Sequence, residues 1–167
     1  MPATISGTTG GIGLIGSGTA QNTTSGTAID FTGIPAGVKR ITVMFNGVST
    51  NGSSILQVQL GSGSVVTSGY IAVGSVVIAS AAAAVTSTTG FPIGNGNAAA
   101  DAHYGFVVCT LVGANTWAAN GSLAGATAFV KSTAGSVTLS GSLDRIRITT
   151  VNGTDTFDAG SINILYE

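Results

Sequence analysis

Hydrophobic and polar residues alternate along many short segments of this chain, and glycine or Asn-Gly separates one segment from the next. In residues 38–46, for example, Ile41, Val43 and Phe45 fall on one side of an extended backbone. A period of two residues is typical of a β-strand with one buried face. The pattern predicts strands at residues 28–31, 38–46, 55–60, 70–78, 103–112, 116–123, 126–131, 136–139, 144–151 and 162–166.

The alternation also predicts which way individual side chains face. In residues 55–60, we expect the three aliphatic side chains to face inward and the two glutamines between them, Gln57 and Gln59, to face outward. In residues 144–151, Arg145 and Arg147 alternate with isoleucines and are expected outside. We interpret the two arginines as a strand edge that makes ion pairs between strands or between subunits.

Turn signals and the absence of helical patterns set the fold class. Asn46-Gly47 and Asn51-Gly52 are typical of tight turns because both residue types tolerate positive φ. The only helix-like run is residues 79–85, and its alanines lack the larger side chains that would bury a helix face. Many short strands separated by turns predict an all-β fold, an antiparallel β-sandwich of jelly-roll type.

The chain is expected to have two parts. Residues 1–25 consist mostly of Gly, Thr and Ser and precede the first predicted strand. We interpret them as an extended glycine-rich N-terminal arm that packs on a neighbouring subunit, because such a terminus needs a contact to become ordered. Residues 26–167 form the β-sandwich domain.

Residues 11–16, Gly-Ile-Gly-Leu-Ile-Gly, match the G-x-G-x-x-G pattern of dinucleotide-binding folds. That motif requires a strand before it and a helix after it, whose N-terminus holds the pyrophosphate. The ten residues before Gly11 are mostly Thr, Gly and Ser, and residues 17–26 have no amphipathic pattern. With 26 glycines in 167 residues, chance explains the match, and no nucleotide or other cofactor is expected.

Charge is scarce throughout the chain. Charged residues make up 7% of the sequence, whereas about 25% is usual in soluble domains. Five basic residues cannot neutralise enough phosphates for nucleic-acid binding. The most apolar run, residues 71–85, is interrupted by Gly and Ser and is too short to span a bilayer as a helix, so no membrane insertion is expected. Because charge usually keeps soluble proteins apart, we expect other copies of this chain or a larger assembly to cover its neutral surface.

Few residues are suited to catalysis or metal binding. His103 is the only histidine, and Asp101 would share its face of a strand, but no nucleophile elbow accompanies them, so His103 is interpreted as a polar residue near a turn. Cys109, the only cysteine, is expected to be a buried apolar residue, and one Cys with one His cannot make a structural zinc site. Asp155 and Asp158 with a nearby asparagine could gather around an ion, although a turn is the favoured interpretation. We therefore expect no enzymatic activity and no metal site.

Three aromatic residues are the candidate ligand-binding positions. Trp117, Tyr70 and Tyr104 could stack against a sugar on a β scaffold. Aromatic residues are only 6% of the chain, however, and so small a set is usually needed for the core. The core is therefore the favoured interpretation for each of the three, and ligand binding is the alternative.

Two segments resemble proteins of known origin. The segment LSGSLDRIRITTVNGTDTFDAGSINILYE, residues 139–167, resembles the C-terminal part of a group of tailed-bacteriophage and prophage structural proteins. The segment IDFTGIPAGVKRITVMFNGVSTNGSSILQVQLG, residues 29–61, resembles the start of the same domain. Residues 62–138 and the N-terminal arm lie outside the resemblance.

The resemblance implies a non-enzymatic component of a phage particle, because members of this group are known as tail-fibre or virion structural proteins. The expected role is a capsid-decoration or fibre subunit that is made in the bacterial cytoplasm and resides on the virion. Its expected partners are other copies of itself, as a homotrimer, and other virion proteins. The alternative is the receptor-binding tip of a tail fibre, which recognises a host surface glycan or protein through the three aromatic residues. An enzyme acting on glycans is the third and least favoured class.

Overall fold

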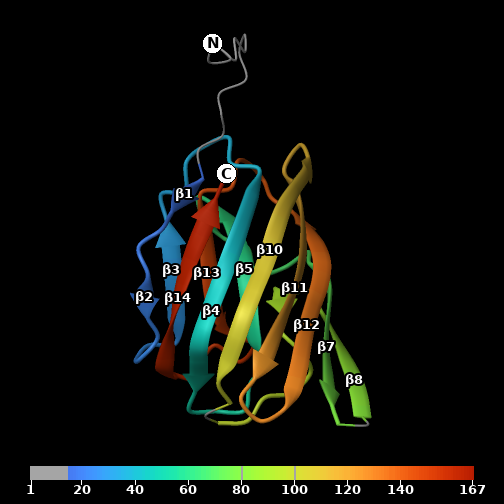
Figure 1. The fold of residues 1–167 in the computed structure, drawn as a ribbon. Helices are drawn as coiled ribbons and strands as arrows, with labels where there is room; N and C mark the ends of the chain where they lie inside the picture. Colours follow the sequence, from blue (N-terminus) through green and yellow to red (C-terminus); the bar gives the residue numbers. More distant parts are fainter. Residues whose placement is uncertain (1–14, 80, 100) are drawn as a thin grey trace, which may run out of the picture.

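The computed structural model describes residues 15–79, 81–99 and 101–167, and these residues form an all-β antiparallel sandwich with no helix (Figure 1). The strands form a nine-stranded and a five-stranded sheet, and all the pairings within the two sheets are antiparallel. The predicted all-β antiparallel sandwich is therefore confirmed.

The nine-stranded sheet has the order β1-β14-β4-β10-β11-β12-β7-β8, and β2 also pairs with β14. In Figure 1, β14, β4 and β10 lie in front of the second sheet, and the β7–β8 hairpin lies at the far side of the sheet from β1. The bounds are β1 Gly16–Ser17, β2 Gln21–Asn22, β4 Arg40–Thr50, β7 Ile71–Ile78, β8 Ala81–Ser87, β10 His103–Gly113, β11 Thr116–Gly125, β12 Phe129–Thr138 and β14 Phe157–Tyr166.

The five-stranded sheet has the order β3-β13-β5-β6, and β9 pairs with β5. Its strands are β3 Ala28–Thr32, β5 Leu56–Ser62, β6 Ser64–Val65, β9 Phe91–Pro92 and β13 Arg145–Thr150. β13 therefore lies inside the sheet, between β3 and β5, and the expectation that its two arginines mark a strand edge is wrong.

The core lies between the two sheets, where the predicted inward positions meet. Ile41, Val43 and Phe45 of β4 are buried as expected, and so are Ile146 and Ile148 of β13. Burying a large aliphatic or aromatic side chain contributes about 1.5–3 kcal/mol, so this layer is the main source of stability. The largest fully buried side chains are Trp117, Tyr70, Phe91, Phe157, Ile41, Leu56, Leu60, Ile93, Leu123, Ile146, Ile148 and Ile162.

Several local predictions need correction. Neither a helix nor a strand is predicted for the helix-like run at residues 79–85, but this run contains most of β8, which pairs with β7 along its whole length. The strands predicted at residues 126–131 and 136–139 are parts of one continuous strand, β12, which begins at Phe129 and ends at Thr138. Asn46-Gly47 lies inside β4, where the register with β10 shifts beside Gly47, and so forms a bulge rather than a turn.

The outward-facing glutamines of β5 are also not exposed. Gln57 and Gln59 are nearly as buried as the aliphatic residues beside them. The Gln59 side-chain amide donates to the carbonyl of Thr89 at 2.8 Å, and the hydroxyl of Thr89 donates to Gln57 Oε1 at 3.3 Å. The loop before β9 thus covers this face of β5 and supplies the polar partners that buried amides require.

The described part of the N-terminal arm lies along β14 of the same chain. β1 pairs with Leu165 and Tyr166, β2 pairs with Ser161 and Ile162, and Gly18 N–H donates to the carbonyl of Ile164 at 2.8 Å. These residues extend the edge of the nine-stranded sheet. Residues 1–14 lie outside the described residues, and the expected contact of the arm with a neighbouring subunit stays a prediction for them.

Candidate functional site

The structure places two of the three candidate aromatic side chains in the core. Tyr70 is 1% exposed and Trp117 is 2% exposed, so neither ring is accessible to a ligand. The Tyr70 ring packs edge-on against Phe91 with centroids 5.0 Å apart, and its hydroxyl oxygen accepts the Leu60 N–H at 2.8 Å. Burial raises the pKa of the Tyr70 phenol well above its usual range. Of the three candidates, Tyr104 alone is substantially exposed, on the outer face of β10.

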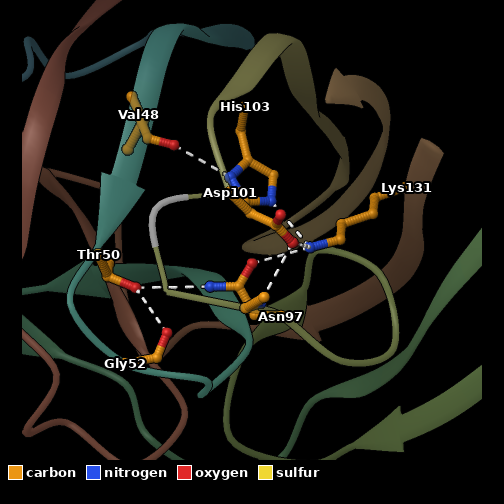
Figure 2. A network of polar contacts seen from close by, with 8 residues as sticks. Val48, Thr50, Gly52, Asn97, Asp101, His103 and Lys131 are labelled. Atoms are coloured by element: carbon orange, nitrogen blue, oxygen red, sulfur yellow. Dashed lines mark hydrogen bonds and ion pairs between the residues drawn. The ribbon is translucent and has the colours of Figure 1, made fainter. Parts of the chain in front are cut away.

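A buried polar network that the sequence did not predict centres on Lys131 of β12 (Figure 2). Phe129 and Thr133 flank Lys131 at the alternate, inward-facing positions of the strand, and all three are buried. Lys131 Nζ lies 2.8 Å from Asn97 Oδ1, 2.9 Å from His103 Nε2 and 3.7 Å from Asp101 Oδ2. The ammonium also lies 4.5 Å from the centroid of the Phe129 ring. Asn97 and His103 therefore accept two of the ammonium hydrogens, and Asp101 adds an ion pair at longer range.

His103 links this network to β4. Its Nδ1 lies 3.0 Å from the carbonyl oxygen of Val48, which can only accept, so Nδ1 carries the hydrogen and Nε2 accepts from Lys131. Asn97 continues the chain of contacts, since its Nδ2 donates to Thr50 Oγ1 at 3.4 Å. Figure 2 shows how these side chains join β4, the loop before β10 and β12. His103 is the first residue of β10, directly after a loop, as its interpretation as a polar residue near a turn predicts, and its buried side chain anchors that loop to β4.

Burial controls the protonation of both bases in the network. Burial, followed by the positive charge of Lys131, holds the pKa of His103 below its ordinary value. Burial also lowers the pKa of Lys131, and Asp101 opposes this effect. Lys131 occupies the Nε2 lone pair of His103 that would otherwise accept a proton from a hydroxyl nucleophile. The arrangement therefore anchors strands and does not resemble a nucleophile–base pair.

The buried histidine predicts a specific pH dependence of stability. In the unfolded chain His103 titrates near pH 6.5, whereas in the folded chain its pKa is lower. The unfolded state therefore binds more protons as the pH falls below about 6.5, and the free energy of unfolding should drop by about 1 kcal/mol between pH 7.5 and 5.5. Urea unfolding at the two pH values measures this drop.

His103→Gln is the control for the pH dependence. His103 is the only histidine of the chain, so the substitution removes the only side chain that ordinarily titrates in this range. The variant should be less stable than the wild type, but its stability should be nearly the same at pH 7.5 and 5.5. An equal drop in the wild type and in the variant would contradict the assignment to His103.

The carboxylates of residues 155 and 158 have different partners, one joining two loops and the other joining two strands. Asp155 accepts from the backbone N–H of Ser54 at 2.8 Å and from Asn152 Nδ2 at 2.6 Å, which ties the turn after β13 to the turn before β5. Asp158 accepts from the hydroxyl of Ser49 on β4. The turn interpretation is confirmed for Asp155, but it is wrong for Asp158, which lies within β14. Within residues 15–79, 81–99 and 101–167, no three His, Cys, Asp or Glu side chains gather as a metal site would require.

Both arginines of β13 form ion pairs, and the pair of Arg147 joins two strands as expected. Arg147 contacts Asp30 of the neighbouring strand β3 through two nitrogens, at 2.7 and 2.6 Å, and the two residues are directly opposite in the register. Arg145 pairs in the same two-pronged way with Asp144, its neighbour in sequence. Both guanidiniums therefore have a carboxylate partner, which leaves no cluster of free positive charge for an anion on this strand.

The outer face of the nine-stranded sheet is the most unusual surface of the described chain. Strands β10, β11, β12, β7 and β8 contain one lysine and one histidine and no acidic residue, and both Lys131 and His103 point inward. The outer face of these five strands therefore carries no charged side chain. Its exposed apolar side chains are Ile71, Val73, Val77, Tyr104, Phe106, Val112 and Val130. An apolar surface with no charge is typical of a contact surface.

None of the residues that the structure describes belongs to a helix long and apolar enough to cross a membrane. No protein-family model, curated protein or solved structure matches this chain.

Proposed function

We propose that this chain is a non-enzymatic structural subunit of a tailed-phage particle, a capsid-decoration or fibre protein. The observation that carries the proposal is the uncharged outer face of β10, β11, β12, β7 and β8 with its exposed aliphatic and aromatic side chains. The resemblance of residues 139–167 and 29–61 to phage structural proteins is the reason for proposing a phage particle. We propose that the outer face is the surface through which the subunit contacts its neighbours.

The energetics of this face favour association over isolation. Ile71 is 78% exposed and Phe106 is 55% exposed, and each would gain about 1–2 kcal/mol by full burial against a partner. Neither would need to break an ion pair, because the outer face of β10, β11, β12, β7 and β8 carries no charged side chain. A surface of this kind has little to keep copies apart in solution, whereas a lattice or fibre covers it with symmetry-related neighbours. We propose a homotrimer as the assembled form.

The buried chemistry supports a structural role as well. The sequence offered His103 and Asp101 as a possible base and its orienting carboxylate, and both now have other partners. His103 contacts Lys131 and Val48, and Asp101 accepts the Ala98 N–H at 3.1 Å and pairs with Lys131. Such a network holds loops and strands together, which suits a protein that must keep its shape within a particle.

Deletion of the gene from the phage that carries it tests the proposal. We expect electron microscopy to show that the deletion mutant's particles lack a surface feature or fibre. Mass spectrometry should detect the protein in purified wild-type virions. Light scattering of the purified chain should give the mass of three copies. Mutant particles with unaltered composition, appearance and stability would contradict the structural role.

A second candidate function is the receptor-binding tip of a tail fibre, and a polar groove favours it. The outer face of the five-stranded sheet has a hollow of about 320 Å³ whose lining includes Gln59, Thr67, Thr89 and Arg147. Side-chain amides, hydroxyls and a guanidinium suit the hydroxyl groups of a glycan.

The groove can be blocked without touching the core, because Thr67 is exposed at its rim. If the chain binds a host glycan here, Thr67→Trp should abolish binding on a glycan array and adsorption to host cells, while Thr19→Trp, at another exposed site, should not. Absence of glycan binding by the wild type would leave decoration or fibre structure as the role.

A further inference from the structure

Most edges of the two sheets are blocked against pairing with another chain. At one edge of the nine-stranded sheet, residues 15–22 form two separate strands of two residues each. At one edge of the five-stranded sheet, β3 carries the charged Asp30, and the side-chain amide of Gln21 donates to the carbonyl of Asp30 at 2.7 Å. Very short strands, charges and covered backbone groups are the usual devices that keep sheet edges from pairing.

The other edge of the nine-stranded sheet, β8, is neither very short nor charged. Its seven residues, Ala81–Ser87, include no charge and no proline, and they pair with β7 without a register shift. All seven are exposed or half-buried. Asn95 Nδ2 donates to the carbonyl of Ala84 at 3.1 Å, and a carbonyl oxygen has a second lone pair for a further donor. An edge strand of this length spans about 23 Å and presents a regular row of backbone donors and acceptors.

The side chains of β8 identify the partner that suits it. In an antiparallel pairing of β8 with itself, centred on Ala84, the opposite residues are Ala84 with Ala84, Ala83 with Val85, Ala82 with Thr86 and Ala81 with Ser87. All of these pairs are small and uncharged, so no like charges meet and no long side chain must be displaced. A charged partner would find no complementary charge on β8, whereas a second copy matches it at every position.

The outer face beside β8 stays free in this pairing. Val73 and Val77 of β7 lie opposite Thr86 and Ala82 in the register, on the outer face, and are 43% and 52% exposed. Two copies joined at β8 would place their β7 strands three strand spacings apart, about 14 Å, so the pairing does not bury these side chains. They remain part of the apolar outer face through which the subunit is proposed to contact other copies.

We propose that β8 pairs antiparallel with β8 of a second copy across a twofold axis, which joins two nine-stranded sheets into one. The inference rests on the proposed structural role and names one of its contacts. A trimer built on the outer face and a twofold contact at β8 use different surfaces. Together they would link subunits into a lattice or a fibre.

Disulfide trapping tests this pairing. Ala84→Cys places two thiols at the centre of the proposed pair, where opposite Cα atoms in antiparallel strands lie about 4.5–5.5 Å apart, a separation that a disulfide can bridge. The native Cys109 is buried and does not compete. We expect mild oxidation to convert the Ala84→Cys protein into a dimer of twice 16.2 kDa on a non-reducing gel. Ala126→Cys, at an exposed site between β11 and β12, should stay a single chain on the same gel.

Introducing a charge at residue 84 provides a second and independent measurement. Ala84→Lys alone, and Ala84→Asp alone, should each lose the β8 contact, because like charges would meet at the twofold axis. An equimolar mixture of the two variants should recover it, which native mass spectrometry would detect as a complex containing one chain of each kind. Circular dichroism identifies any variant that fails to fold, and the Ala84→Cys protein then decides the question.

The outcomes separate this inference from the proposed function. An assembled wild type that shows no Ala84→Cys cross-link overturns the β8 pairing and leaves the structural role standing. Equal cross-linking of Ala84→Cys and Ala126→Cys also overturns it. If the wild type is a single chain but Ala84→Lys is no longer incorporated into phage particles, β8 docks on a different virion protein, and pairing between copies is overturned.

Discussion

Replacing Lys131 with alanine is expected to lower the free energy of unfolding by about 3 kcal/mol or more. The ammonium is nearly inaccessible to solvent and contacts Asn97 Oδ1 and His103 Nε2 at hydrogen-bond distance. Its loss leaves both acceptors without their donor inside the protein and removes the positive charge beside Asp101. The shorter side chain also leaves a cavity against Phe129.

Two further variants separate these causes. Lys131→Met keeps most of the volume and removes only the donor and the charge, so it should cost less than Lys131→Ala, about 1–3 kcal/mol. Lys39→Ala removes a lysine that is exposed before β4 and should change stability by less than about 0.5 kcal/mol. Urea unfolding at pH 7.5 measures all three. A Lys131→Ala protein as stable as Lys39→Ala would show that the network contributes nothing to stability.

Strand positions could be predicted from the sequence because the pleat of a strand imposes a local period of two. Ile41, Val43 and Phe45 lie on one buried face for this reason, as do Ile146 and Ile148. Each prediction used only residues within one segment. The fold class followed from the number of such segments and from the turns between them.

The exceptions arise where distant segments decide the environment. Gln57 and Gln59 have the polarity of an outward face, but a loop some 30 residues later covers them, and Thr89 contacts both. The alanines of residues 81–84 suit a helix by propensity, but pairing with β7 makes them a strand. Asn-Gly at residues 46 and 47 is suited both to a hairpin turn and to a bulge, because each needs positive φ at the glycine.

The polar network could not be predicted for the same reason. Lys131 lies 34 residues after Asn97 and 28 after His103, and nothing in a single segment links it with either residue. One local signal was present, since Lys131 lies two residues after Phe129 in a strand and therefore shares its inward face. A lysine at an inward position of a strand indicates a buried partner elsewhere in the chain.

Replacing Gly160 with alanine is expected to destabilise the fold by about 3 kcal/mol. Gly160 lies at the bulge where β14 shifts register against β4, and its φ of +93° is beyond the left-handed region that alanine tolerates. A Cβ at this position would lie 2.4 Å from the carbonyl carbon of Gly47, so the backbone of β4 would have to move. This movement would disturb the pairing of β14 with β4. Residues 15–23 pair with β14 and would be disturbed as well.

Gly153→Ala is the matched control for Gly160→Ala. Gly153 also has a positive φ, +68°, but it lies in the turn after β13, and a Cβ there would meet nothing within 4 Å. It should therefore cost only the backbone strain, about 1 kcal/mol. Alanine residues already occupy left-handed conformations in turns of this chain, with φ of +47° at Ala114 and +59° at Ala128, which supports so modest a value. Urea unfolding measures the stability of both variants. Equal urea midpoints for Gly160→Ala and Gly153→Ala would show that the close approach of Gly160 to Gly47 does not constrain the sheet.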